Sequence, residues 1–294
     1  MSFFAVMVWS HGFSEENVGF KPKFHFKVSG GFLYAAIGDM NKHLNSMDAY
    51  YRNYYGELAS GEIKSLNNGA SDFEVEIMRD LSRKLRLGLG VSVPIHLENE
   101  SRFYGAAIDV YRVDHEKIFR PEIKVWMPAK LSLYYSIFSK SRMNLYFYSG
   151  ISLYSVKMNE ERLQFNTYPS GSVYYNTAYI KVKKKLSPGW QAGLSFEYDL
   201  LRNLSLVGEL EGHVARISHL KGGVEWTTNY GGESTFGDSG ELYFYGSPDS
   251  YYEISIGAPP HLMIIEPLPP GYVERPARLD MSRFSIRFGL KISL

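Results

Sequence analysis

The sequence predicts an all-β protein, namely an eight-stranded antiparallel up-and-down transmembrane β-barrel. Two observations carry this prediction. Apolar and polar residues alternate along eight segments of the chain, and the connections between these segments alternate between short and long. A period of two is the pattern of a strand with one apolar face. Short turns at one end and long loops at the other, on an even number of strands, are typical of a transmembrane barrel.

The alternation is clearest in four of the eight segments. Between Leu85 and Ile95 every second residue is aliphatic, and no charged residue interrupts that face. The apolar faces of residues 123–135, 143–153 and 284–294 likewise contain no charged residue. The remaining four segments span residues 23–37, 71–81, 187–200 and 204–218.

The connections between the segments fall into two groups that alternate strictly. The short ones are residues 82–83, 137–142 and 201–203, and the long ones are residues 38–70, 98–119, 157–186 and 220–280. In an outer-membrane type of barrel the short turns face the periplasm and the long loops face outward. The sequence therefore predicts short periplasmic turns and four long external loops.

Three prolines, Pro94, Pro128 and Pro188, lie in or beside predicted strands. Proline removes a hydrogen-bond donor from a ladder and is tolerated at strand ends and bulges. Counted from the short turns, the three prolines lie about 8 to 12 residues up the strand, near the outer rim of a span that needs about 9 to 11 residues. We therefore expect them at this rim, with a β-bulge at Pro128.

Alternation alone does not say which face points inward, because a soluble eight-stranded barrel shows the same pattern with its apolar side inside. Glycines on the polar faces and the asymmetry of the connections favour the membrane, where apolar side chains face lipid and charged ones enter the lumen. We expect polar side chains that pair with one another and so plug the lumen. The alternative is a gated polar path through it. Its members are Arg86, Lys130, Glu197, Glu209, Glu211, Arg283 and Arg287, with Lys84, Lys124 and Lys291 also on the polar faces.

Composition excludes several classes of protein. The formal net charge of the 294 residues is +1, so nucleic acid is not an expected partner. The absence of cysteine excludes disulfides and thiolate zinc sites. The apolar run Phe3–Trp9 resembles part of a secretory signal, so we expect residues 1–18 to be a truncated signal peptide and residues 19–294 to be the barrel.

Taken together, these segments resemble the small eight-stranded outer-membrane barrels of the outer-membrane protein A and outer-membrane protein W families. The stretch Arg287–Leu294 resembles the C-terminal signal read by the outer-membrane assembly machinery, although it ends in Leu294 where an aromatic residue is usual. The resemblance implies a place in the bacterial outer membrane and the assembly machinery as a partner. Similarity to the outer-membrane protein W family further implies, as an alternative function, a narrow channel for small or hydrophobic solutes.

The sequence contains no recognised catalytic or metal-binding motif. The eight histidines form no recognised metal spacing, and neither a phosphate-binding loop nor a GxSxG elbow occurs. His213 shares a face with Glu209 and Glu211, but its parity directs it into the lumen, away from any lipid substrate. We therefore expect no enzyme activity and no catalytic, metal or cofactor site, a lipid-modifying enzyme being the least favoured alternative.

Two external features are candidates for binding. Four lysines of the third long loop could pair with lipopolysaccharide phosphates, namely Lys181, Lys183, Lys184 and Lys185. The fourth long loop is rich in proline and tyrosine and could contact an extracellular protein or glycan. The sequence thus favours a structural or surface-interaction role through external loops.

Overall fold

The computed structural model describes residues 20–108, 112–229, 232–245, 261–265 and 274–294. The expected signal segment and most of the region rich in proline and tyrosine lie outside these ranges. Most of the described residues belong to antiparallel strands. In this part of the chain, no helix combines the length and the apolar character needed to span a membrane.

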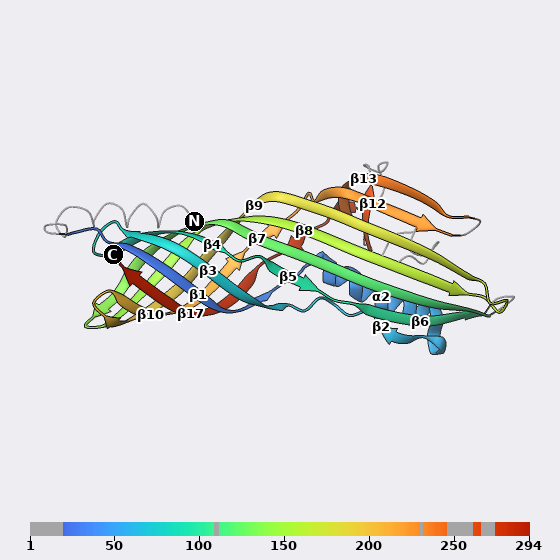
Figure 1. Cartoon of the computed structure of the whole chain (residues 1–294), viewed down its shortest axis with the longest axis horizontal. Helices are drawn as coiled ribbons and strands as arrows, with labels where there is room; N and C mark the ends of the chain where they lie inside the picture. Colours follow the sequence, from blue (N-terminus) through green and yellow to red (C-terminus); the bar gives the residue numbers. More distant parts are fainter. Residues whose placement is uncertain (1–19, 109–111, 230–231, 246–260, 266–273) are drawn as a thin grey trace.

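Eight antiparallel strands pair in a closed ring (Figure 1). The order around the ring is β1, β3, β4, β7, β8, β9, β10 and β17, and β17 pairs back with β1. Each of the eight predicted segments corresponds to one of these strands. Their bounds are β1 Phe24–Ala35, β3 Gly69–Asp80, β4 Leu85–Ser92, β7 Arg112–Lys140, β8 Met143–Thr167, β9 Val173–Leu201, β10 Leu204–Val214 and β17 Arg283–Ser293.

The apolar faces of the ring strands point outward. Leu87 is 38% exposed whereas its neighbour Arg86 is 5% exposed, so the alternation puts hydrocarbon outside and charge inside. The same direction holds around the ring, where Phe32, Leu89 and Phe288 are among the exposed residues. An exterior of this kind is stable in lipid and not in water, because contiguous apolar surface is costly to hydrate.

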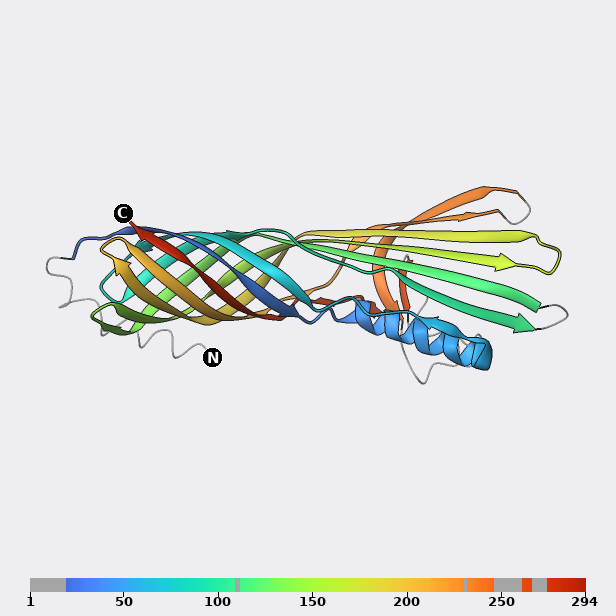
Figure 2. The same cartoon turned by 60° about the horizontal axis from the view of Figure 1, so that its bottom comes forward.

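Three ring strands continue far beyond the barrel. β7, β8 and β9 contain 29, 25 and 29 residues, whereas a membrane strand needs about 9 to 11. Their outer halves leave the ring and form an open sheet, hereafter the extension (Figure 2). The extension is widened by β2 Ser60–Glu62, β5 Ile95–Glu98, β6 Ser101–Ile108, β12 Lys221–Thr228, β13 Ser234–Tyr245, β14 His261–Ile265 and β15 Glu274–Pro276, and a separate pair is formed by β11 Arg216–Ile217 and β16 Leu279–Asp280.

The prediction that the four long connections are loops is therefore wrong, because they contain secondary structure. The predicted alternation of short and long connections between ring strands is correct. Residues 98–119 form most of the β6–β7 hairpin, and residues 157–186 continue the β8–β9 hairpin. These segments alternate less regularly than the membrane-facing strands because both of their faces meet side chains or water, not lipid. Long connections of this kind carry secondary structure of their own more often than not.

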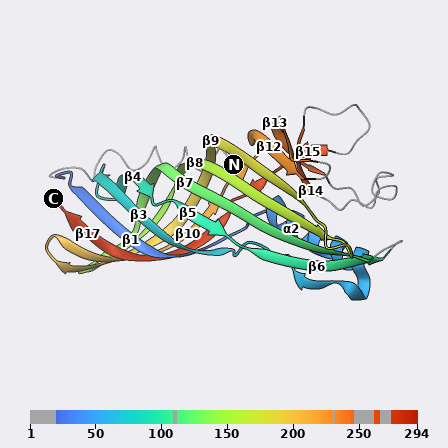
Figure 3. The same cartoon turned by 45° about the vertical axis from the view of Figure 1, so that its right-hand side comes forward.

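The first long connection contains a helix. α2 spans Asp39–Tyr55 and is followed by a short 3-10 turn, η1, at Gly56–Leu58. The buried residues Met40, Leu44 and Met47 recur at helical spacing, a signal for this helix that the sequence already contained. Figure 3 shows α2 alongside the extension, where its buried face joins the same hydrophobic core as the sheet.

The polarity of the interior reverses between the barrel and the extension. Inside the barrel the buried residues are largely charged, whereas in the extension the buried core is apolar and includes Ile123, Val125, Val156 and Ile180. The reversal coincides with an extra residue in β7, between Trp126 and Ala129, and with another in β9, between Lys184 and Ser187, where β8 runs from Tyr154 to Val156 without one. These levels lie beside the three prolines, as expected for an outer rim, and the bulge predicted at Pro128 is confirmed.

This reversal corrects part of the predicted facing. Ile95, Ile123, Val125 and Met127 were expected on the lipid face, but they are at most 4% exposed and belong to the core of the extension. A bulge adds a residue to one strand, and each added residue turns the following side chains to the opposite face. Parity can therefore be extrapolated along a strand only as far as its next bulge.

Arginine substitutions at Leu89 and Val173 test where along the strands the membrane ends. Leu89→Arg should destabilise the folded protein by about 2 to 4 kcal/mol, because it places a charge on the lipid face near mid-barrel. Val173→Arg at the far end of β9 should stay within about 0.5 kcal/mol, because an exposed side chain there meets water. Urea titration of the protein in lipid vesicles measures both, and equal effects would contradict this placement of the bilayer.

Candidate functional site

Buried charged residues fill the inside of the barrel. Every second residue on the ring strands points inward, and the pairing brings these side chains from all sides to one axis. Among the described residues in the barrel part of the ring strands, six cations and six carboxylates are buried, so the formal charges balance there. They are Lys27, Arg86, Lys130, Arg283, Arg287 and Lys291, with Asp72, Glu74, Glu76, Glu197, Glu209 and Glu211.

Arg287 lies at the centre of this set. Its Nη1 is 3.2 Å from Asp72 Oδ2 and 2.9 Å from Glu74 Oε2, and its Nη2 is 3.0 Å from Glu211 Oε1. Its Nε donates a hydrogen bond of 3.3 Å to Glu209 Oε2, the residue directly opposite it on β10. The planar guanidinium presents five donors, which allows one side chain to tie β3, β10 and β17 together.

Two lysines flank Arg287. Lys27 Nζ lies 2.5 Å from Glu209 Oε1 and 2.6 Å from Glu76 Oε2. Lys130 Nζ lies 2.8 Å from Glu74 Oε2 and 2.5 Å from Glu211 Oε2. Each ammonium thus bridges a carboxylate from β3 and one from β10. These two strands lie on opposite sides of the lysine's own strand, so each lysine cross-links the interior.

Two tyrosines complete the middle of the barrel. The rings of Tyr134 and Tyr148 lie 4.8 Å apart and are at most 1% exposed. Their hydroxyls donate to Glu76 Oε2 at 2.7 Å and Glu211 Oε2 at 2.9 Å. Glycine is needed beside them, because a Cβ on Gly193 would lie 2.7 Å from the Tyr148 hydroxyl oxygen.

The network continues toward both ends of the barrel. Near the short turns, Arg86 Nη1 lies 2.8 Å from Glu197 Oε1, and Glu197 also forms an ion pair with Lys291. Near the outer rim, His213 Nδ1 is 2.7 Å from the Tyr154 hydroxyl, and its Nε2 contacts Glu211. His213 therefore points into the barrel and not toward the lipid face.

The structure places all seven residues of the predicted polar network inside the barrel. Six of them take part in the ion pairs above, and Arg283 Nη2 lies 3.3 Å from His213 Nε2. Lys84 and Lys124, also assigned to polar faces, are instead exposed, because Lys84 borders a turn and Lys124 lies beyond the bulge in β7. Four further members, Lys27, Asp72, Glu74 and Glu76, were not predicted from the sequence. Their alternation with the outward-facing Phe26 and Phe73 already contained that signal.

The lysines proposed to contact lipopolysaccharide lie in strand β9, not in a loop. Lys181, Lys183 and Lys185 are exposed and Lys184 is partly buried. The register places Lys183 directly opposite Lys157 on β8 and Lys221 on β12.

Lys157 in turn is opposite Lys124 on β7. Four exposed lysines from four neighbouring strands therefore form one row, hereafter the lysine row, just beyond the level where the interior polarity reverses. Directly opposed like charges destabilise a sheet unless anions neutralise them.

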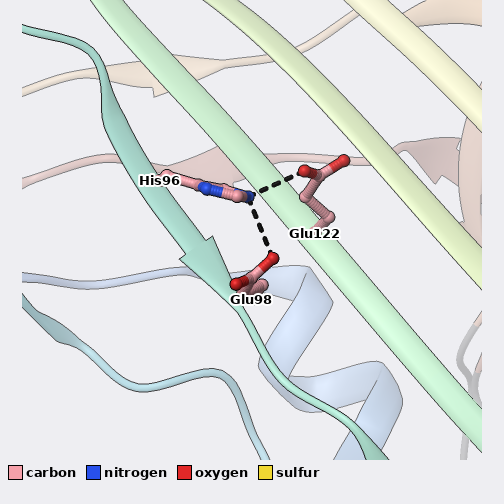
Figure 4. Close-up of side chains that lie close together, drawn as sticks. All are labelled: His96, Glu98 and Glu122. Atoms are coloured by element: carbon pink, nitrogen blue, oxygen red, sulfur yellow. Dashed lines mark hydrogen bonds and ion pairs between the residues drawn. The ribbon is translucent and has the colours of Figure 1, made fainter.

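A possible set of metal ligands lies beside this row. Figure 4 shows His96 Nε2 between two carboxylates, 3.2 Å from Glu98 Oε2 and 2.7 Å from Glu122 Oε1. However, Lys124 Nζ lies 2.6 Å from the same Glu122 oxygen, and Asn159 Nδ2 donates to the other at 2.6 Å. The ammonium already neutralises this carboxylate, so the set is an exposed ion-pair cluster whose geometry gives no support to a cation.

Comparison with known proteins shows similarity to solved structures alone. No protein-family model and no curated protein matches the sequence. A major outer membrane protein from Thermus thermophilus is 12% identical with a TM-score of 0.34, covering 94% of this chain and 100% of that one. OprG from Pseudomonas aeruginosa is 8% identical with a TM-score of 0.32, covering 92% and 95%. The outer membrane protease OmpT from Escherichia coli is 11% identical with a TM-score of 0.31, covering 96% and 100%.

Similarity at this level does not transfer an activity to this chain. Its own structure provides the stronger argument. A closed antiparallel ring leaves no unpaired edge, its outer face is apolar, and its charges are inside, as a strand protein needs in order to lie in a bilayer. The chain is a transmembrane β-barrel of the outer-membrane type.

The central position of Arg287 generates a prediction about stability. Arg287→Met should destabilise the protein by about 3 to 5 kcal/mol, because it leaves several buried carboxylates without their cation. Arg112→Met, which removes an exposed ion pair with Asp114, should cost less than about 1 kcal/mol. Urea unfolding in vesicles compares the two variants, and a small effect at Arg287 would show that the network is not held together there.

Proposed function

We propose that this protein is an outer-membrane anchor with a plugged lumen, whose extension is its working surface. One observation carries the proposal: buried charges of equal number and opposite sign, most of them in ion pairs, and two adjoining tyrosine rings occupy the inside of the barrel. A barrel of eight strands is just wide enough for side chains to fill it. A structural or surface-interaction role therefore fits better than transport through the lumen.

The extension supports this role by its construction. It has a hydrophobic core of its own, formed by α2 and the outer halves of β7, β8 and β9, so its shape is fixed. The core is closed toward the barrel by Tyr154 and Ala215, both buried. A rigid surface that binds a partner loses little conformational entropy on association, which favours a binding role for the extension.

We further propose that outer-membrane lipid contacts the lysine row formed by Lys124, Lys157, Lys183 and Lys221. The row lies a few residues beyond the rim, at the height where lipid phosphates would be found. Each lysine near an anionic surface contributes about 1 kcal/mol of attraction. Lys124 already pairs with Glu122, so lipopolysaccharide phosphates would chiefly supply counter-charges to Lys157 and Lys183, which have lysines opposite them on both sides.

The plugged lumen predicts the result of a conductance measurement. In planar bilayers the protein should show no steady openings, whereas Tyr134→Ala combined with Tyr148→Ala should open discrete steps, because the two rings fill the axis. Tyr135→Ala is the matched control, since the Tyr135 side chain lies on the outer face and is 40% exposed. Steady openings of the unaltered protein would favour the alternative, a narrow channel.

The lysine row predicts lipid retention. Lys157→Glu combined with Lys183→Glu should reduce lipopolysaccharide co-purifying from asymmetric outer membranes by about thirtyfold, the equivalent of about 2 kcal/mol. Lys84→Glu combined with Lys140→Glu makes the same charge change at the short-turn end and should leave retention unchanged. Equal loss in both variants would mean that lipid is held by overall charge and not by the row.

A further inference from the structure

An apolar cavity of about 530 Å³ lies in the extension, beyond the barrel. Helix α2 forms one wall, the inner face of β7, β8 and β9 forms the floor, and the β12–β13 hairpin forms the other wall. Pockets that hold small molecules in proteins typically measure about 300 to 1,000 Å³. Apolar side chains dominate its lining, including Met47, Tyr51, Phe119, Leu163, Trp226 and Phe236.

One cation lies at the floor of this cavity. Lys117 is 5% exposed, its Nζ donates a hydrogen bond of 2.5 Å to Gln164 Oε1, and the Tyr51 ring centroid lies 4.4 Å from it. Within the described residues, no carboxylate forms an ion pair with Lys117. The neighbouring Arg162 differs, because Glu160 Oε1 accepts from its Nε at 2.6 Å.

A buried ammonium without a counter-ion is unfavourable, because burial removes its hydration and neither an amide oxygen nor a ring face replaces a full negative charge. Burial accordingly lowers the pKa of Lys117 to about 8. At neutral pH the amine is still mostly protonated. The extension therefore keeps a positive charge at the bottom of an apolar cavity, at a cost that an anionic ligand would remove.

We propose that this cavity binds an amphipathic monoanion, with its carboxylate or sulfonate at Lys117 Nζ and its apolar body against Met47 and Trp226. The apolar walls disfavour a strongly hydrated dianion, and the single unpaired charge matches one negative group. Phe236, which is 55% exposed on the β12–β13 hairpin, forms part of the rim. The site lies outside the barrel lumen, so it does not depend on whether the lumen is plugged.

Titration calorimetry of the full chain in detergent micelles, with 2-naphthoate as the probe and empty micelles as the blank, tests this site. The unaltered protein should bind the probe saturably, and Lys117→Gln should weaken binding at least tenfold. Lys117→Arg keeps the charge and should restore most of the affinity. Lys140→Gln removes an exposed lysine at the short-turn end of β7 and should leave binding unchanged.

Two further measurements keep the proposal open to refutation if Lys117→Gln fails to fold. Phe236→Asp places a negative charge at the exposed rim and should also weaken binding at least tenfold. The uncharged analogue 2-naphthamide should bind the unaltered protein at least tenfold more weakly than 2-naphthoate. Absence of saturable 2-naphthoate binding, equal binding of the amide, or full binding by Phe236→Asp would each overturn the proposal.

The pH dependence of binding isolates the role of Lys117. Affinity should fall as the pH rises through about 8, because the lysine loses its charge. The other groups facing the cavity keep their charge between pH 7 and 10. Burial raises the pKa of Tyr51 to about 12 and lowers the pKa of His43 and His115 below 6.5. Arg162 remains paired with Glu160, and this arginine together with His43 lowers the pKa of the Glu160 carboxyl. Affinity that is constant from pH 7 to 10 would contradict an ion pair at Lys117.

Discussion

The structure depends on one constraint, which is that three long strands pass through two different solvents. In the bilayer, apolar side chains must face outward and charges must be inside; beyond it, water outside requires the opposite arrangement. β7, β8 and β9 meet both requirements because their pairing becomes irregular where the solvent changes. Bulges in β7 and β9 change which residues face inward, while β8 keeps one inward face on which Val156 and Met158 follow Tyr148 and Ser152, so the same sheet then encloses an apolar core in place of an ionic one.

The ionic interior follows from the same constraint. Once apolar residues cover the outside of a narrow barrel, the inward positions are shielded from water, and charges there are stable only when each finds a partner. Arg287, Lys27 and Lys130 each contact carboxylates from more than one strand, so the network cross-links the ring. Such an interior is suited to holding a barrel rigid and not to opening it.

Beyond the rim, the reversed arrangement creates two surfaces of different character. Exposed lysines from four strands align into a row just beyond the level where the interior changes from charged to apolar. The inward face packs with α2 and leaves an apolar cavity around Lys117. In the row, Lys157 and Lys183 each have lysines directly opposite them on both neighbouring strands, and in the cavity no described carboxylate forms an ion pair with Lys117; both features therefore suggest anionic ligands.

The sequence by itself determined the eight ring strands, the outward direction of residues such as Leu87, and the inward position of Glu209, Glu211 and Arg287, because parity along a strand is a local property. The positions of the three prolines also indicated where the outer rim of the barrel lies. Only the tertiary structure showed that Ile123 and Val125 are buried and Lys124 is exposed, because the alternation of faces along a strand does not continue across a bulge. Strand register, set by contacts between residues far apart in the chain, alone determined the alignment of the four lysines and the isolation of Lys117 from a carboxylate.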